Sequence, residues 1–162
     1  MICKSDYIFR LQFKINKKRL YPLMRIYEMK RLITYLTFNG NCREAMSFYR
    51  DCLGGELQYQ TIGETPDAGK IPENMKRYIF QATLIKDNCI IVATDLVCDS
   101  QLIKGNSVSI LIECTNKKEM KTFYKKLSEG GNPVHPIQNT FWDTWFGGLT
   151  DKYNNNWLLQ YK

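Results

Sequence analysis

The sequence predicts an α+β fold made of two copies of one unit, in which a strand and a helix are followed by three more strands. Two helical patterns begin at Asn41 and Asn116, 75 residues apart, and each ends at a pair of glycines. Each pattern carries a Phe-Tyr pair, at 48–49 and at 123–124, again 75 residues apart. Repeated units bury their apolar faces against each other. We therefore expect a pseudo-symmetric mixed sheet, curved like part of a barrel, around a cleft suited to a small molecule.

The first unit is expected to occupy residues 29–96. Its leading strand is the β-branched and aromatic run 32–38. Asn41 is a candidate N-cap, and Glu44 is placed to complete a capping box. The helix that follows carries apolar residues at helical spacing, namely Cys42, Ala45, Met46, Tyr49 and Leu53. Further strands are predicted at 56–62, 77–85 and 89–95, with a turn between the last two.

The segment 63–75 lies between two of these strands. Pro66, Gly69 and Pro72 interrupt any regular pattern, so a loop is predicted. Two roles remain open for it: a lid that folds over a binding site, or a solvated loop without a function of its own.

The second unit is expected to occupy residues 105–162, after a linking segment at 97–105. A strand is predicted at 108–114, and the next helix has an apolar stripe of Met120, Phe123, Tyr124 and Leu127. The strand at 132–138 is weaker because two prolines interrupt it. An aromatic strand at 140–149 and a last strand at 156–161 complete the unit. Residues 29–162 are thus expected to form one domain.

Residues 1–28 differ from the rest in charge, and two interpretations remain open. They hold seven basic and two acidic residues, whereas residues 29–162 hold 16 basic and 14 acidic residues. Met29 is a candidate start site, which would leave this stretch outside the native protein; alternatively the stretch is a poorly ordered basic arm. Because the excess charge is concentrated there, no nucleic-acid partner is expected for the domain.

Composition limits the remaining classes. A chain of 162 residues with 44% hydrophobic residues can bury a normal core. No segment approaches the ~18 apolar residues that span a bilayer, so no membrane partner is expected. The six cysteines show no C-x-x-C spacing, and Cys42 and Cys52 lie on the apolar stripe of the first helix. Buried free thiols fit a reduced, cytoplasmic setting.

The chain from about Met29 to Tyr161 resembles the PhnB-like branch (YjdN type) of the vicinal oxygen chelate superfamily, which includes glyoxalases, bleomycin resistance proteins and dioxygenases. The residues that carry the resemblance span both units: Tyr35 to Asn41, Glu44-Ala45, Phe48-Tyr49, Gly54 to Glu56, Gly105 to Ser109, Lys126 to Gly131, Pro136 to Trp142, Phe146-Gly147, Leu149 to Tyr153 and Trp157. The resemblance implies paired βαβββ modules that form an open cup, usually in a homodimer.

Metal-dependent members of that superfamily place His or Glu ligands on the first and fourth strands of each module. Here those positions fall on residues without an imidazole: Ile33 or Thr34, Thr94 or Asp95, Ser107 to Ser109, and Leu158 to Gln160. A transition metal needs several His, Cys or carboxylate ligands. Neither a metal nor any other cofactor is therefore expected, which disfavours metal-dependent isomerisation or ring cleavage.

Two titratable residues are weak candidates for catalysis. His135 is the single histidine of the chain and so the one available imidazole base. It lies between two prolines with no acid at a spacing that would orient it, and an ordinary strand histidine is the alternative. Asp95 is the second candidate.

The aromatic run 141–146 is the strongest candidate for ligand binding. Alternation on a strand would place Trp142 and Phe146 on one face and Trp145 on the other. Aromatic rings can stack on a planar ligand, or they can simply be core residues. Gln138 is a candidate hydrogen-bond donor to a ligand carbonyl, with backbone satisfaction as the alternative.

Two functions from different classes follow. The first is a metal-free protein that binds a small organic molecule in an aromatic cup around Trp142 and Phe146. The second is an enzyme of lyase, isomerase or dioxygenase type that acts on a small organic substrate, with His135 or Asp95 as the base or as part of an unexpected metal site. The binder is favoured because the positions that would hold the electrophilic metal lack suitable ligands.

Overall fold

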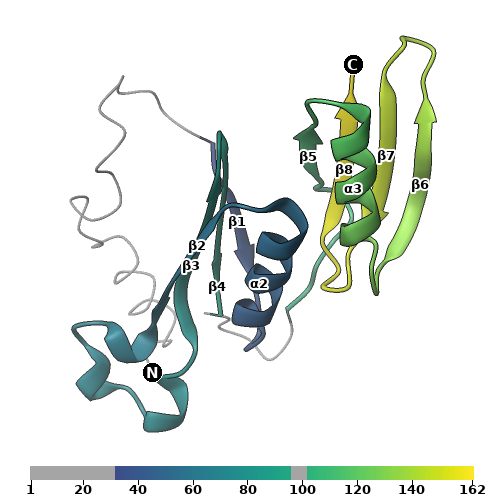
Figure 1. Ribbon diagram of the computed structural model, residues 1–162. Helices are drawn as coiled ribbons and strands as arrows, with labels where there is room; N and C mark the ends of the chain where they lie inside the picture. Colours follow the sequence, from purple (N-terminus) through teal and green to yellow (C-terminus); the bar gives the residue numbers. More distant parts are fainter. Residues whose placement is uncertain (1–31, 96–101) are drawn as a thin grey trace.

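The computed structural model describes residues 32–95 and 102–162. Two four-stranded sheets are formed, with the strand orders β1-β4-β3-β2 and β5-β8-β7-β6. In each sheet the first strand of the module pairs in parallel with the fourth, and the other pairs are antiparallel. Each module has one helix between its first and second strands. The predicted repeat of two βαβββ modules is confirmed (Figure 1).

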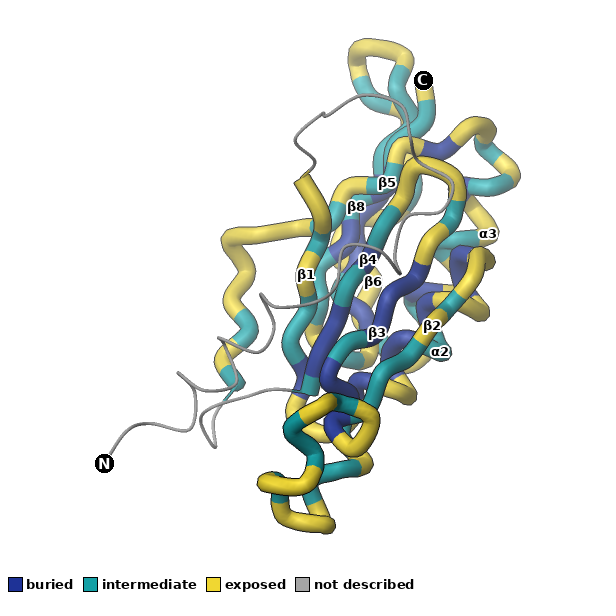
Figure 2. The backbone as a smooth tube through the Cα atoms, turned by 90° about the vertical axis from the view of Figure 1, so that its left-hand side faces the viewer, coloured by how far each residue is buried: buried dark blue, intermediate teal, exposed yellow. Residues whose placement is uncertain are grey.

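The first module contains the elements β1 (Thr34–Thr37), α2 (Cys42–Leu53), β2 (Glu56–Thr61), β3 (Ile79–Lys86) and β4 (Cys89–Thr94). The helix buries one face, made of Cys42, Ala45, Met46, Tyr49, Cys52 and Leu53. In Figure 2 the buried residues follow β3 and β4, the two central strands of this sheet. The helical spacing of apolar residues therefore predicted the buried face correctly.

Residues 62–75 are more regular than the predicted loop. They contain three single-turn 3-10 helices, at Ile62–Glu64, Ala68–Lys70 and Glu73–Met75. The first is held by Glu64, whose carboxylate accepts hydrogen bonds from the backbone N–H and the hydroxyl of Thr61 at 2.6 and 2.9 Å. These bonds lower the pKa of the Glu64 carboxyl. The segment extends from the end of the first sheet, below it in Figure 1.

The second module contains β5 (Ile110–Glu113), α3 (Lys117–Leu127), β6 (Asn132–Asn139), β7 (Trp145–Thr150) and β8 (Asn156–Tyr161). Pro133 and Pro136 do not interrupt β6, contrary to the weak strand that was predicted. The reason is position: β6 is an edge strand, where a proline costs no hydrogen bond on the solvent side. Its pairing with β7 does shift register between Pro133 and Gln138.

The aromatic strand predicted at 140–149 is shorter than expected. β7 begins at Trp145, and residues 140–144 form the turn that joins it to β6. The turn is closed by the Thr140 N–H, which donates to the Thr144 carbonyl at 2.8 Å. Asp143 has φ of 58°, in the left-handed region that few side chains adopt. That backbone requirement ends the strand alternation on which the sequence argument relied.

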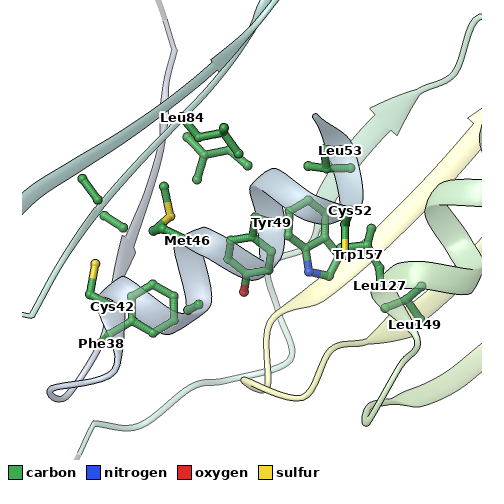
Figure 3. Packing of buried hydrophobic residues seen from close by; sticks show 14 of the residues in the cluster. Phe38, Cys42, Met46, Tyr49, Cys52, Leu53, Leu84, Leu127, Leu149 and Trp157 are labelled. Carbon is green, nitrogen blue, oxygen red and sulfur yellow. The ribbon is translucent and has the colours of Figure 1, made fainter. Parts of the chain in front are cut away.

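The two modules meet through their helices and share one core. Tyr49 of α2 lies 5.3 Å from the Trp157 ring of β8 between ring centroids (Figure 3). Asp151, which is 2% exposed, accepts hydrogen bonds on Oδ2 from the Tyr49 hydroxyl at 2.6 Å and from Trp157 Nε1 at 2.7 Å. Its Oδ1 accepts from the backbone N–H groups of Tyr153 and Asn155 at 2.8 and 2.9 Å. Four donors thus satisfy this buried carboxylate.

The described cysteines are free thiols, and three of the four are buried. Burial raises the pKa of Cys52 to about 12 and that of Cys114 to about 11, so both thiols stay protonated. Several predicted features lie outside the described residues: Cys3 and Cys98, the N-terminal stretch 1–28, and the ends of the first predicted module at 29–31 and 96. No described helix is long and apolar enough to cross a membrane.

Candidate functional site

The second sheet has one face covered by α3 and one open face. Gly147 of β7 marks the covered side, because a Cβ built on it would lie 3.2 Å from the Tyr124 ring of α3. Alternation along β7 then directs the neighbouring residues, Phe146 and Gly148, to the open face. A Cβ on Gly148 would instead meet His135 at 3.1 Å and Leu158 at 3.2 Å, and neither of those residues belongs to the helix.

A row of four residues crosses this open face. Gln138 of β6 is in register with Phe146 of β7, and Phe146 is in register with Gln160 of β8. Gln160 is in register with Glu113 of β5. The Gln160 side-chain amide donates to Glu113 Oε1 at 2.9 Å, which confirms that these two share a face. The row places an aromatic ring between two amides, with a carboxylate at one end.

A second row lies beside the first and is more apolar. His135, Gly148, Leu158 and Leu111 occupy corresponding positions on β6, β7, β8 and β5. The His135 and Phe146 rings are 6.4 Å apart between centroids, at an interplanar angle of 45°. Because Gly148 has no side chain, the His135 and Leu158 side chains can approach each other over it. The result is a shallow apolar floor with an imidazole at its edge.

The β5 end of this face borders a cleft between the modules. The cleft has a volume of about 550 Å³ and lies where β1, the β3–β4 hairpin and β5 come together. Its lining mixes apolar and polar residues and includes Ile91, Ile112, Leu111 and Glu113, and the last two also belong to the open face. A concave site of this size that combines apolar and polar groups suits a small organic ligand.

Of the predicted binding residues, the structure brings Gln138 and Phe146 together and separates Trp142 and Trp145 from them. Trp142 lies on the β6–β7 turn, 78% exposed, so the expected shared strand face for Trp142 and Phe146 is wrong. Trp145 packs on the α3 side, where the Lys117 ammonium lies 3.1 Å from its ring centroid. The Trp145 indole therefore does not belong to the open face.

Asp95 has a structural role in the first module. Its Oδ1 accepts a hydrogen bond from the Cys42 backbone N–H at 2.9 Å, and its Oδ2 accepts from the Ile79 N–H at 3.0 Å. The carboxylate therefore caps the N-terminus of α2 and ties it to β3, although it lies 53 residues further along the chain. The predicted N-cap, Asn41, makes no side-chain cap hydrogen bond. Both of Asp95's oxygens are engaged, which leaves it poorly placed as a base.

The positions equivalent to superfamily metal ligands do not converge on a metal site. Thr34 is in register with the core residue Ile91 and shares its face toward α2. The Thr94 hydroxyl donates to the Phe80 carbonyl at 2.9 Å and is buried. Residues 107–109 precede β5. Within residues 32–95 and 102–162, no three His, Cys, Asp or Glu side chains are grouped as metal ligands. The donor set therefore does not fit the metal of that superfamily.

Glu113 and the role of Gln160 beside it were missed by the sequence argument. A strand was predicted at 108–114, but nothing local shows that β5 pairs with β8 and not with another strand. The equivalent position in the first module is Thr37, so the repeat did not predict a carboxylate at Glu113 either.

Comparisons with known proteins identify the family of the chain. Residues 30–160 match the family model described as 3-demethylubiquinone-9 3-methyltransferase, whose members are PhnB-like. The chain belongs to this family. It is 30% identical over 139 residues to the protein YjdN of Escherichia coli K12, a match that covers 79% of this chain and 92% of YjdN.

Solved structures extend the likeness of this PhnB-like chain to the fold. Protein PA1353 of Pseudomonas aeruginosa is 33% identical, with a TM-score of 0.71, over 83% of this chain and 98% of its own. A PhnB protein of Bacillus cereus is 22% identical, with a TM-score of 0.64, over 82% and 100% of the two chains. A glyoxalase/bleomycin resistance protein of Albidiferax ferrireducens T118 has a TM-score of 0.54 at 10% identity, over 82% and 99% of the two chains, and so shares the fold alone.

Proposed function

We propose that this PhnB-like protein binds a small planar organic molecule on the open face of the second sheet, without a metal of its own. The observation that carries the proposal is the row formed by Gln138, Phe146, Gln160 and Glu113. Each member comes from a different strand, so the sheet fixes the spacing of the row.

The chemistry of this row suits a planar ligand with polar groups at its edges. The Phe146 ring offers a stacking surface of about one aromatic ring. The Gln138 amide makes no hydrogen bond with a described residue, so it can bind a ligand carbonyl or hydroxyl without losing a partner. Glu113 can accept a hydrogen bond from the ligand while it keeps the one from Gln160. Leu158 and Leu111 supply the apolar floor beside the ring.

A second copy of the chain is part of the proposal, because the face is too open to enclose a ligand. Leu111 is 48% exposed, and His135 and Gln138 of the same face are exposed as well. Two-fold dimers are the commonest assemblies of soluble proteins, and a partner sheet laid over this face would convert it into a cup. Sedimentation velocity over a range of concentrations tests this step. A monomer at all concentrations would leave the ligand bound on a half-open face.

An enzyme remains the second candidate because of one contact. His135 lies on the same face as Phe146, so a ligand stacked on the ring would be next to an imidazole. Turnover of the bound compound with a pH–rate profile that His135→Ala abolishes would favour this function. Incubation with the methyl donor S-adenosylmethionine tests the reaction in the family description.

The decisive experiment is a ligand screen read by two-dimensional NMR on isotope-labelled protein. Aromatic and heteroaromatic carbonyl compounds are expected to shift the backbone signals of β6, β7 and β8. Phe146→Ala should weaken binding by roughly tenfold or more, through loss of one stacking ring. Phe141→Ala is the matched control, because it removes the same ring from the exposed turn. Equal weakening by both variants, or shifts confined to the first module, would contradict the proposed site.

A further inference from the structure

The outer surface of α3 carries a group of lysines that the proposed ligand site does not use. Five of its eleven residues are lysines: Lys117, Lys118, Lys121, Lys125 and Lys126. At 3.6 residues per turn, Lys117, Lys121 and Lys125 follow one another along one flank of the helix, and Lys118 adjoins the same flank. We call these four residues the α3 lysine stripe. The groove that they line also includes Thr122 and Glu129.

The charge of this stripe is largely uncompensated. Lys118, Lys121 and Lys125 are exposed, and none forms an ion pair with a residue that the structure describes. Glu119, on the same helix, is bound to Thr115 and lies 4.0 Å from Lys86. Lysines four residues apart repel one another, and the first turn of a helix disfavours cations. Repulsion within the stripe therefore lowers the stability of the protein, and a bound anion would reverse this loss.

Exposed aromatic side chains continue the stripe at the N-terminal end of α3. The Lys117 ammonium lies over the Trp145 ring, at the start of β7, and so joins the helix to the β6–β7 hairpin. On the turn of that hairpin Phe141 is 94% exposed and Trp142 is 78% exposed. Their rings are 5.9 Å apart in an edge-to-face pair. Figure 1 shows the turn extending beyond this end of α3.

We propose that the α3 lysine stripe and the Phe141-Trp142 pair together bind single-stranded nucleic acid. Sites that bind single strands without sequence preference combine a basic track for the phosphates with aromatic rings on which bases stack. Successive lysines of the stripe rise by about 6 Å along the helix, which is close to two steps of a stacked strand at roughly 3.4 Å each. The stripe can thus contact alternate phosphates while a base stacks on the hairpin turn.

The geometry favours this partner over an anionic membrane. An eleven-residue helix is about 16 Å long. If the aromatic turn were inserted in a membrane, the far end of the stripe would be farther from the membrane surface than the screening length, which is about 8 Å at physiological salt. An acidic polypeptide would satisfy the lysines but gives the two exposed rings no specific role. The expectation that no nucleic acid binds rested on net charge, which does not show that lysines gather on one helix.

Fluorescence anisotropy with a short labelled oligothymidylate tests the proposal on the full chain. Four lysine–phosphate contacts predict that log K falls with log salt concentration with a slope of about −3. The triple variant Lys118→Gln, Lys121→Gln, Lys125→Gln should reduce that slope by about 2 units. Glutamine keeps the helix propensity close to that of lysine, so α3 should remain folded. Replacing Lys70, Lys76 and Lys162 by Gln removes the same charge elsewhere and should leave the slope nearly unchanged.

The aromatic half of the site is tested by a separate binding measurement. The double variant Phe141→Ala, Trp142→Ala should weaken oligothymidylate binding at least about fivefold, with the salt slope unchanged. Phe146→Ala should leave this binding intact, which separates the site from the proposed ligand face. The proposal is overturned if the wild type fails to bind at low salt, or if the stripe variant and its control bind alike. Equal or tighter binding of polyglutamate or of phosphatidylserine vesicles at the same salt would also overturn it.

Discussion

In the first module the polar groups at the ends of the sheet bond to the backbone, whereas in the second module comparable groups stand on an open face. Thr94 and Asp95 are fully engaged with β3 and the start of α2. Glu113, Gln160 and Gln138 lie across the second sheet, with one hydrogen bond among them. In the proposed function the second module binds the ligand, because its polar groups have fewer partners than those of the first module.

The two helices also differ in how much of their surface is buried. α2 lies between its own sheet and the second module and has six buried residues, whereas α3 has two. A helix that packs on two sides needs a wide apolar face. α3 packs mainly on its own sheet, so its outer flank is free to carry charge. The repeat in the sequence therefore predicts similar backbones but not similar surfaces.

The largest expected effect is at the junction of the modules. Asp151→Ala should destabilise the protein by about 3–5 kcal/mol, because Tyr49 and Trp157 would lose their acceptor in a buried site. Urea denaturation followed by tryptophan fluorescence and by far-UV circular dichroism measures the loss. Two separate transitions would show that the modules had uncoupled, and a loss below about 1 kcal/mol would mean that the junction contributes little.

A smaller effect is expected at the glycines that follow the two helices. Gly55 has φ of 98°, and an added Cβ would lie 2.5 Å from the Ile85 carbonyl oxygen. Gly131, 76 residues later, passes as closely to the Thr150 carbonyl but has no positive φ. Either residue changed to Ala should destabilise by about 1–3 kcal/mol from overpacking, and Gly55→Ala should cost more because of its backbone conformation. Thermal unfolding of both variants compares them directly.

The helix caps offer a third comparison. Asp95→Ala removes two hydrogen bonds to backbone N–H groups and should cost about 2 kcal/mol. Asn116→Ala removes one bond, to the Glu119 N–H, and should cost about 1 kcal/mol. Asp95→Asn is the matched control, since it keeps an oxygen for one of the two donors. Equal losses in denaturation experiments would show that the long-range cap of α2 is no stronger than the local cap of α3.

The smallest effect concerns pH. Hydrogen bonds from the backbone N–H and hydroxyl of Thr115 lower the pKa of Glu119 in the folded protein. A carboxyl with a lowered folded pKa stabilises the fold above its unfolded pKa of about 4.3, and this contribution is lost as pH falls through the folded value. Glu119→Gln should therefore cost about 0.5 kcal/mol at neutral pH and less in acid.

Glu64 of the first module makes the same two bonds to Thr61 and has its pKa lowered for the same reason. Glu64→Gln should change the pH dependence of stability in the same direction but less, because this carboxylate lies on the surface. Stability curves for both variants against pH, measured by urea denaturation, test the difference. A larger effect for Glu64→Gln would show that the local bonds of the first module matter more than their exposure suggests.

The sequence correctly predicts features whose cause is local. Helical spacing predicted the buried face of α2, and Gly54 caps that helix as predicted, whereas α3 ends at Ser128, before its pair of glycines. The sequence does not predict features that depend on one residue's backbone conformation or on a residue distant in the chain. The positive φ of Asp143 turned the expected aromatic strand into a hairpin turn, and this moved Trp142 away from Phe146. Asp95 took the capping role expected of Asn41 because β4 ends beside the first turn of α2.

The sequence by itself determined the repeated βαβββ units and the apolar face of each helix, since both follow from periodicity and from glycine. Only the tertiary structure decided which side chains share a surface. Gln138, Phe146, Gln160 and Glu113 form a row because β5 pairs with β8 and β8 with β7. Strand pairing brings together residues that are distant in the chain, and no local pattern specifies which strands will pair.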